Sequence, residues 1–412
     1  MERRVVVTGL GAITAIGNSV EEFWKGIKEG KCGIDQITLF DAEGYKVKLA
    51  GEVKGYNPEE YFEKREAKRL DRFVQFAIVA AREAMQDSKL SAENTDMTKV
   101  GVVIGSGIGG LKTIEEQCNI LFEKGPDRIS PMYIPMSISN MAAGNVAIEV
   151  GAKGESMSIV TACASGTHSI GEAFRLIRHG YQDAVIAGGC EASITPTGIA
   201  GFTNIKALSQ NSDKTRASIP FDKERSGFVM GEGAGILILE ELEHAKKRNA
   251  KIYAEVVGYG ATSDAYHITS PSPDGEGGAR AMMLAIEDAK IKPEEVDYIN
   301  AHGTSTHLND ACETMAIKKA LGEASKKVMV SSTKGNTGHL LGGAGGVEAV
   351  ACVKAIEDQF VPPTINYQVP DEECDLDIVP NQGRNAKVRF AMSNSLGFGG
   401  HNSSILLKQY EE

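Results

Sequence analysis

The sequence predicts an α/β fold with mixed sheets, in which one α/β unit is used twice. Strand-like runs alternate with amphipathic segments along the 412 residues. A pattern of strand, small-residue turn and helix occurs once in each half, as IVTACASGTHSIGEAFRLI and MVSSTKGNTGHLLGGAGGVEAVACVKAI. Each half also closes with a glycine-rich turn and a strand. We therefore expect two halves, residues 1–250 and 251–412, with a junction near Lys246–Lys251.

The expected strands are short runs rich in β-branched and other apolar residues. In chain order they are Arg4–Thr8, Val100–Ile104, Ser158–Val160, Ala184–Ala187, Gly235–Glu240, Ile252–Gly258, Val296–Asn300, Val328–Ser331 and Arg389–Met392. The amphipathic segments Glu66–Asp87 and Gly277–Ala289 are expected helices between them. The glycines of GLGAITAIG lack the complete dinucleotide-binding pattern, so close helix packing explains them better.

Composition and charge exclude several classes of function. The formal net charge of -11 argues against nucleic acid or an anionic membrane as a partner. Seven scattered cysteines without a C-x-x-C pair fit neither a disulfide framework nor a zinc finger, and they suit a reducing compartment. The sequence shows no apolar run long enough for a signal peptide or a membrane span. We expect a cytoplasmic protein.

Cys163 is the first candidate for chemistry, in the stretch SIVTACASGTHSIGEAF. Ile170, Phe174 and Ile177 recur at helical spacing, so a helix is expected to begin close to the cysteine. A thiol at a helix start is exposed to the positive end of the helix dipole, which favours the thiolate. From the local pattern alone, a nucleophile and a small buried apolar residue are both open interpretations.

His302 in YINAHGTST and His339 in STKGNTGHLLGGAGG follow expected strands, in loops where α/β folds place reactive groups. Metal binding by Cys163 and the two histidines is a rival interpretation. It is weak in sequence because the three residues lack a short paired spacing, and no metal is expected. A hydrolase of the Cys-His-Asn type is a second rival, but papain-like surroundings of the cysteine are absent.

The sequence resembles the elongating β-ketoacyl-[acyl-carrier-protein] synthases of the synthase II type, within the thiolase-like condensing enzymes. The motifs that carry the resemblance are TACASGTHSIG, AHGTST, STKGNTGHLLGGAGG and SNSLGFGGHN, which occur in the family's order over nearly the whole chain. The resemblance implies a thiolase-like fold of two α/β halves in five αβαβα layers, and a homodimer. It implies decarboxylative condensation of a cysteine-bound acyl chain with malonyl-[acyl-carrier protein], with acyl carrier protein as partner and no required cofactor.

The resemblance also assigns roles to residues. Cys163 is the expected nucleophile, His302 and His339 stabilise the enolate, and Lys334 supports them. The backbone N–H groups of Cys163 and Phe398 form the expected oxyanion hole, and Phe398 acts as a gate. Other assignments are Thr304 and Thr306 for pantetheine, Ile108, Ile134 and Phe202 for the acyl pocket, and Asn300, Glu348, Ser393 and Asn394 for a polar network that holds a monovalent cation.

A basic patch for the acidic carrier protein is expected beside the tunnel mouth. Its members are Lys64, Arg65, Lys68, Arg69, Arg128 and Lys206. A solvated helix face is the alternative interpretation of this charge run. The sequence departs from the family at His307 and His401, where relatives commonly carry proline and threonine. A polyketide ketosynthase and a non-catalytic chain-length partner are alternative functions, and the presence of Cys163 argues against the second.

Overall fold

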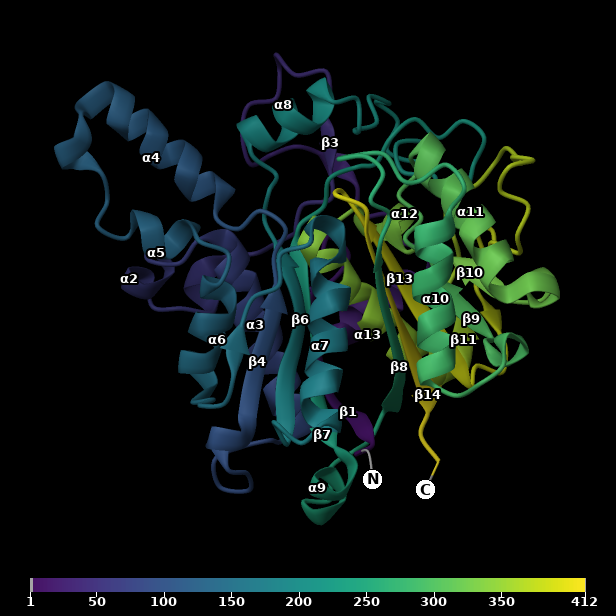
Figure 1. Cartoon of the computed structure of the whole chain (residues 1–412). Coiled ribbons are helices and arrows are strands. Elements are labelled where there is room, and N and C mark those ends of the chain that lie inside the picture. The colour runs from purple at the N-terminus through teal and green to yellow at the C-terminus, as the bar shows by residue number, and fades with distance from the viewer. Residues whose placement is uncertain (1–2, 412) are drawn as a thin grey trace.

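The computed structural model describes residues 3–411 and contains a ten-stranded mixed sheet at its centre (Figure 1). The first half contributes β1 (Val5–Ile13), β4 (Val100–Gly105), β5 (Ser156–Met157), β6 (Ala184–Glu191) and β7 (Gly233–Glu241). The second half contributes β8 (Ala254–Ser263), β9 (Tyr298–Asn300), β10 (Met329–Ser331), β13 (Phe390–Gly397) and β14 (His401–Gln409). The short strands β2 (Asp35–Gln36), β3 (Leu49–Ala50), β11 (Phe360–Val361) and β12 (Arg384–Asn385) form two small ribbons.

The strand order repeats between the halves, as expected for one unit used twice. The order across the sheet is β10-β9-β13-β14-β8 in the second half and β1-β7-β6-β4-β5 in the first. Read outward from the junction, each half runs first, fifth, fourth, second and third strand of its own series. The short antiparallel pairing of β1 with β8 joins the halves. The boundary predicted near residue 250 falls in the connection between β7 and β8 and stays a prediction.

Helices α7 (Ser165–Arg178) and α13 (Ala344–Asp358) lie between the two halves of the sheet and contact both (Figure 1). Helices α3 (Arg72–Ser88) and α6 (Met141–Val150) cover the outer face of the first half, and α10 (Glu276–Asp288) and α11 (His307–Leu321) cover that of the second. This is the expected five-layer arrangement. The other helices are α1 (Val20–Lys28), α2 (Lys64–Ala67), α4 (Leu111–Lys124), α5 (Tyr133–Ser137), α8 (Pro196–Asn204), α9 (Leu242–Lys247) and α12 (Lys334–Thr337). No helix within residues 3–411 is both long enough and apolar enough to cross a membrane.

The glycines of the GLGAITAIG stretch serve packing, as expected, because Gly9 and Gly11 lie inside β1 against α3. A Cβ atom on Gly11 would lie 1.9 Å from the carbonyl oxygen of Ala80, and one on Gly9 would lie 2.3 Å from that of Ala84. Larger residues here would push the helix away from the sheet.

Two predicted elements differ from the structure. The segment Glu66–Asp87 is divided, because Asp71 caps the start of α3 by accepting the N–H of Phe73, and α2 ends before it. The strand predicted at Ser158–Val160 is displaced to β5, which ends at Met157. The chain leaves the sheet there to form the turn that carries Cys163.

Candidate active site

Cys163 lies in a tight turn (Ala162–Ala164) that leads directly into α7, so the predicted helix start is confirmed. The turn places Ala162 at a φ of 52°, a left-handed conformation that is strained for alanine. The Ser165 hydroxyl closes the turn by accepting the N–H of Thr161 at 2.9 Å and donating to the carbonyl of Ala162 at 2.7 Å. The Cys163 side chain is buried, with 7% of the residue exposed.

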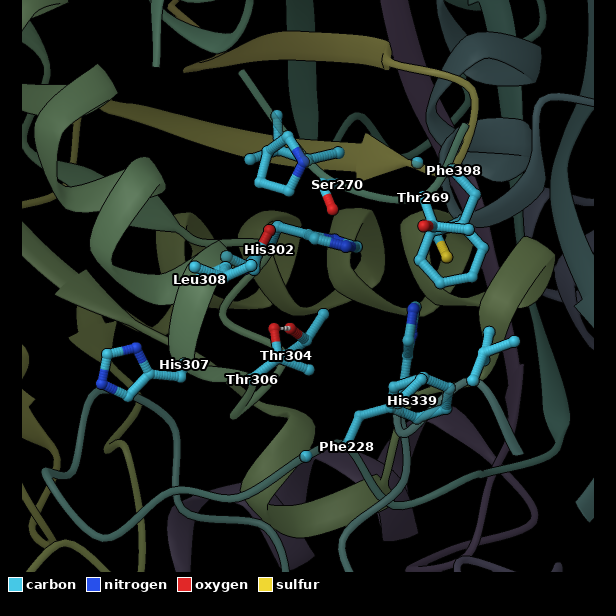
Figure 2. A pocket seen from close by; sticks show the side chains of 18 of the residues that line it. Phe228, Thr269, Ser270, His302, Thr304, Thr306, His307, Leu308, His339 and Phe398 are labelled. Carbon is cyan, nitrogen blue, oxygen red and sulfur yellow. Dashed lines mark hydrogen bonds between the residues drawn. The ribbon is translucent and has the colours of Figure 1, made fainter. Parts of the chain in front are cut away.

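The second half supplies the two histidines. His302 follows β9, and its N–H and that of Gly303 donate to the buried carboxylate of Glu313 on α11 at 2.7 and 2.8 Å. His339 follows α12, and its N–H donates to the carbonyl of Val229 at 2.7 Å. The two imidazoles meet edge to face with ring centroids 5.2 Å apart, and their tips point into the same space beside Phe398 (Figure 2). The Cys163 sulfur and one nitrogen of each ring all lie within 4.8 Å of one another.

Burial determines the protonation state of this cluster. It raises the pKa of the Cys163 thiol to about 12, although the positive charge of Lys334 and the N–H of Phe398 act in the opposite direction. Burial also holds the pKa of His302 and of His339 well below 6.5, and the charge of Lys334 lowers both further. At neutral pH the cluster therefore contains a thiol and two neutral imidazoles. Burial therefore opposes the thiolate that the helix start was expected to favour.

Lys334 is buried directly behind the histidines, with 2% of its side chain exposed. Its ammonium donates to the carbonyl of His302 at 2.6 Å and forms an ion pair with Glu348 on α13. The charge of Lys334 thus has a counter-ion inside the protein. Lys334 is therefore not a solvent-exposed lysine on the surface of a turn.

Backbone N–H groups converge on the thiol. Those of Cys163 and Phe398 lie near the Cys163 sulfur, where they act to lower the pKa of its thiol. The end of β13 approaches closely because residue 397 is glycine: a Cβ there would lie 2.7 Å from the carbonyl oxygen of Thr161. The two N–H groups that were assigned to an oxyanion hole therefore come from different halves, and that role stays a prediction.

A cavity of about 310 Å³ opens onto the cluster. Thr304 and Thr306 line it, with their hydroxyls 3.0 Å apart (Figure 2), and Lys206 and His307 lie along its wall. Sequence reasoning missed several lining residues that lie outside the four motifs of the resemblance, namely Phe228, Asp264, Thr269, Ser270 and Pro271. It also gave no role to Asn402, which is the last residue of the SNSLGFGGHN motif and lies on β14.

Two buried carboxylates were also missed by sequence reasoning. Glu313 accepts the N–H of His302, as described above. Glu191 accepts the N–H groups of Gly107 at 2.7 Å and Gly342 at 3.1 Å, and so joins loops of both halves behind the thiol. No sequence signal distinguishes such buried acids from surface ones.

The predicted acyl-pocket residues separate into two groups. Ile108 and Phe202 pack in the same apolar cluster as Cys163, and their role in an acyl pocket stays a prediction. Ile134 is 57% exposed on α5 and lies outside that cluster. Within one chain it does not reach the pocket.

The predicted basic patch is not assembled at the cavity mouth. Lys206 lines the cavity, but the other five members are exposed elsewhere and do not line it. Figure 1 shows α2, which carries Lys64 and Arg65, on the opposite side of the molecule from α11. Charge runs on separate helices cannot be placed on one face from sequence alone.

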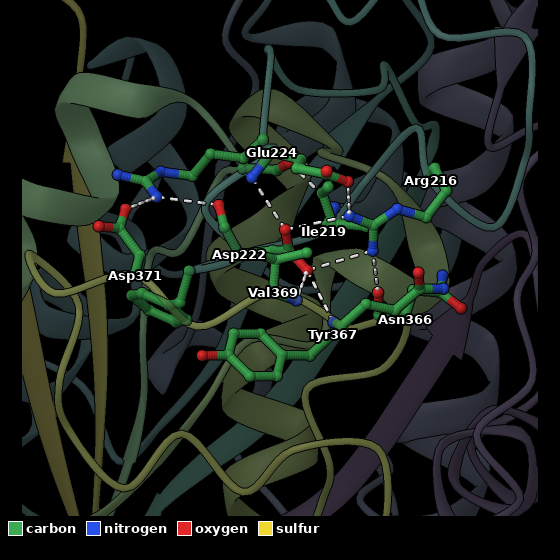
Figure 3. Close-up of polar contacts among 12 residues, drawn as sticks. Arg216, Ile219, Asp222, Glu224, Asn366, Tyr367, Val369 and Asp371 are labelled. Atoms are coloured by element: carbon green, nitrogen blue, oxygen red, sulfur yellow. Dashed lines mark hydrogen bonds and ion pairs between the residues drawn. The ribbon is translucent and has the colours of Figure 1, made fainter.

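A polar network supports the wall of the cavity (Figure 3). The Arg216 guanidinium pairs with the buried Asp222 at 3.0 Å, and Asp222 also accepts the N–H of Val369 at 2.9 Å. Arg225, whose side chain is fully buried, pairs with Asp371. This network attaches the segment that leads to the 226–228 turn to residues 366–371, so the turn is held in place where it lines the cavity.

Comparison with known proteins agrees with this geometry. The β-ketoacyl synthase N-terminal domain family matches residues 2–245, and the C-terminal domain family matches residues 253–368. The chain is 56% identical to 3-oxoacyl-[acyl-carrier-protein] synthase 2 of Synechocystis sp., over 100% of this chain and 99% of the relative. It is 54% identical to the enzyme of the same name from Staphylococcus aureus, over 98% and 100%.

Solved structures give the same result. One is a type II PKS acyl-carrier protein in complex with its ketosynthase bound to the hexaketide, at 40% identity and a TM-score of 0.93 with complete coverage of both chains. Another is a β-ketoacyl synthase from Burkholderia phymatum, at 31% identity and a TM-score of 0.91 with complete coverage of both. With family matches in both halves and relatives above 50% identity along the whole length, the chain belongs to the β-ketoacyl synthase family.

Proposed function

We propose that this enzyme elongates fatty acyl chains by decarboxylative condensation, using the Cys163 cluster as its active site. It joins a cysteine-bound acyl group to malonyl-[acyl-carrier protein] and releases CO2 and a 3-oxoacyl-[acyl-carrier protein]. The observation that carries the proposal is the convergence of one thiol and two imidazoles within 4.8 Å at a cavity. The high identity to 3-oxoacyl-[acyl-carrier-protein] synthase 2 enzymes favours fatty acid elongation over a polyketide role.

Acyl transfer comes first. The Cys163 sulfur attacks the thioester carbonyl, and its proton leaves during the attack, since the raised pKa leaves little thiolate beforehand. A neutral imidazole accepts that proton and delivers it to the departing carrier thiolate. The N–H groups of Cys163 and Phe398 donate to the oxyanion. The product is an acyl-enzyme and a free carrier thiol.

Condensation follows when malonyl thioester enters the cavity. Loss of CO2 leaves negative charge on the thioester oxygen, and His302 and His339 each donate an N–H to it. Their low pKa values matter here, because a neutral imidazole donates a hydrogen bond to the enolate without transferring its proton to it. One preorganised donor contributes about 3 kcal/mol to the transition state. The enolate carbon then attacks the acyl-enzyme carbonyl, the C–S bond breaks, and the Cys163 sulfur leaves as a thiolate that regains its proton from solvent.

Four variants test these roles. Cys163→Ala should abolish acyl adducts in intact-protein mass spectrometry after mixing with an acyl-carrier protein. Cys163→Gln should block condensation and still release CO2 from malonyl-carrier protein. His302→Ala and His339→Ala should each lower that CO2 release about 10²–10³-fold. Release at the parent rate by a folded histidine variant would contradict the enolate assignment.

We also propose a monovalent cation in the buried polar network beside the site. Asn300 and Ser393 are cross-strand neighbours on β9 and β13, and Glu348 faces them from α13. The side-chain polar atoms of Asn300, the hydroxyl of Ser393 and one oxygen of Glu348 are buried without a hydrogen-bond partner. These oxygens suit a monovalent cation, which would accept their unused lone pairs. The side-chain oxygen of Asn394, by contrast, already has a hydrogen-bond partner, because it accepts the Ser404 hydroxyl at 2.8 Å. A higher melting temperature in K⁺ than in tetramethylammonium, lost in Ser393→Ala, would support this site.

A homodimer explains the apolar surface of the first half. Phe122, Ile148 and Val160 are 84%, 79% and 54% exposed on α4, on α6 and after β5. β5 lies at the outer edge of the sheet. Pairing of two chains over this face would cover these side chains and bring Ile134 towards the neighbouring pocket. Light scattering should give twice the mass of 44.0 kDa.

Acyl carrier protein is the proposed substrate carrier, and Lys206 its contact at the cavity mouth. Lys206→Glu should raise the KM for carrier-bound acyl groups and leave that for small thioesters unchanged. The same substitution at Lys64, Arg65, Lys68, Arg69 or Arg128 tests whether a neighbouring subunit brings them into the surface. The seven free cysteines suit the cytoplasm, where we place the enzyme.

A further inference from the structure

The Cys163 cluster has the composition of a soft metal site, although no metal motif exists in the sequence. Cys163 and His302 are distant in the chain, but the fold brings their donor atoms and that of His339 within 4.8 Å. All three residues are buried, with 7%, 2% and 1% exposed. A thiol and two imidazoles are the ligands that Zn²⁺ prefers.

The donor atoms are free to bind. Nδ1 of His302 and both ring nitrogens of His339 are buried and have no hydrogen-bond partner. Cys163 forms no disulfide. Figure 2 shows the two imidazoles pointing into one space from different loops. The cavity gives an ion access to that space, since all three residues line it.

We propose that Cys163, His302 and His339 bind one Zn²⁺ ion reversibly, and that this ion inhibits the enzyme by occupying the nucleophile. In a tetrahedral site, Zn–N distances of about 2.0–2.1 Å and Zn–S distances of about 2.3 Å separate the ligand atoms by roughly 3.3–3.6 Å. Because no two donor atoms are more than 4.8 Å apart, the contraction needed is at most about 1.5 Å, which side-chain rotation supplies. Water from the cavity takes the fourth position.

Binding is balanced in charge and atoms without any redox change. The S–H bond of Cys163 breaks, its proton passes to solvent, and the sulfur electron pair coordinates the ion. Lys334 repels the ion, but its pairing with Glu348 limits this effect. Because the cluster offers no oxygen ligand, Mg²⁺ and Ca²⁺ should not compete. Zn²⁺ binding depends only on the geometry of the cluster, whereas the inhibition rests on the proposed role of Cys163 as the nucleophile.

The experiment uses the intact enzyme with ZnCl2 in equilibrium dialysis and with CoCl2 as a spectroscopic probe. We expect one tightly bound ion per chain, a thiolate-to-cobalt charge-transfer band, and loss of acyl transfer that EDTA restores and Mg²⁺ does not mimic. Cys163→Ala should remove the band and weaken Zn²⁺ binding at least about 100-fold. Cys118→Ala, which removes a partly exposed cysteine on α4 outside the cluster, is the matched control and should keep both.

His339→Ala provides a second variant, with circular dichroism to confirm folding. It should weaken Zn²⁺ binding by a similar factor and shift the cobalt spectrum. The proposal is overturned if the wild-type enzyme retains no Zn²⁺, or if Zn²⁺ affinity is unchanged in folded Cys163→Ala and His339→Ala proteins. Because the readout is metal content and absorption, either result is separate from the outcome of the acyl-transfer experiments.

Discussion

Lys334 and Glu348 form a buried ion pair. Replacing one of the two residues should destabilise the folded protein strongly, whereas replacing both should destabilise it only mildly. Only 2% and 3% of their side chains are exposed. Removing one partner of such a pair leaves an uncompensated buried charge, at a cost of about 3–5 kcal/mol. Lys334→Met and Glu348→Leu should each destabilise the protein by this amount.

The double variant should recover most of that loss. Met and Leu leave no buried charge. The remaining loss of stability comes from the hydrogen bond that Lys334 donates to the carbonyl of His302 at 2.6 Å, and it should be about 1 kcal/mol. For 412 residues the unfolding entropy at the midpoint is roughly 0.9 kcal/mol/K. The single variants should therefore melt about 3–6 °C below the parent, and the double variant about 1 °C below it.

The assay is thermal unfolding followed by the fluorescence of Trp24, the single tryptophan, which is 3% exposed and donates to Asp358 at the end of α13. Lys326→Met removes one side of an exposed pair, at 72% and 90% exposure, and should change the melting temperature little. A double variant that loses the sum of the two single losses would refute the reasoning, since the charges would then not be coupled.

The stability of the Lys334→Met variant should depend on pH, because the variant leaves Glu348 without its buried counter-ion. Burial raises the pKa of Glu348, and Lys334 opposes that shift. Without the lysine the folded-state pKa lies higher above the unfolded value of 4.5, so the variant binds a proton on folding. Its deficit should be smallest below pH 4.5 and should grow as the pH rises through the folded-state pKa. A deficit that shrinks with rising pH would contradict this assignment.

Three further predictions concern the site and its support. Gly342→Ala places a Cβ 2.1 Å from the backbone nitrogen of Gly107, so acyl transfer should fall at least about 10-fold. Gly44→Ala is the control and should be neutral, because the space around Gly44 is open. Equal activities of the two variants would contradict the close approach of Gly342 to Gly107. Asp222→Ala removes the buried partner of Arg216 and should lower the free energy of unfolding by about 3 kcal/mol in a denaturant titration. Glu224→Ala removes a partner that is 63% exposed and should have little effect. A larger loss in Glu224→Ala than in Asp222→Ala would be inconsistent with the network of Figure 3. CO2 release from malonyl-carrier protein should stay constant as the pH falls from neutral through 6.5, because the pKa values of His302 and His339 lie well below it; an inflection near 6.5 would mean that the imidazoles titrate normally.

The sequence predicts best what short segments determine. The turn at Cys163, the loop after β9 and the close packing of Gly11 on α3 depend on neighbouring residues or on small-residue requirements, and all were expected. The division of the Glu66–Asp87 segment was not expected, because Asp71 also accepts the hydroxyl of Thr113 at 2.6 Å, a contact over 42 residues. Hydrophobic periodicity contains no information about such a contact.

Properties that depend on the assembled surface or interior were also missed. Lys64 and Lys206 look alike in sequence as basic residues, but only Lys206 lines the cavity. Ile134 has the character of a pocket residue, but its position on α5 leaves it exposed in one chain. In both cases the missing information is which face of the molecule an element occupies.

The protonation state of Cys163 has the clearest physical meaning. A helix start favours the thiolate, and this can be suggested from a short sequence window, but the burial that opposes the thiolate comes from residues of both halves, including Phe228 and Leu341. The same burial keeps His302 and His339 neutral. The site is therefore uncharged at rest apart from the internally paired Lys334. Negative charge appears in the cluster only when a substrate develops an oxyanion or an enolate there. The N–H donors already point to that position before the charge forms. Under this condition hydrogen bonds stabilise a transition state more than a ground state.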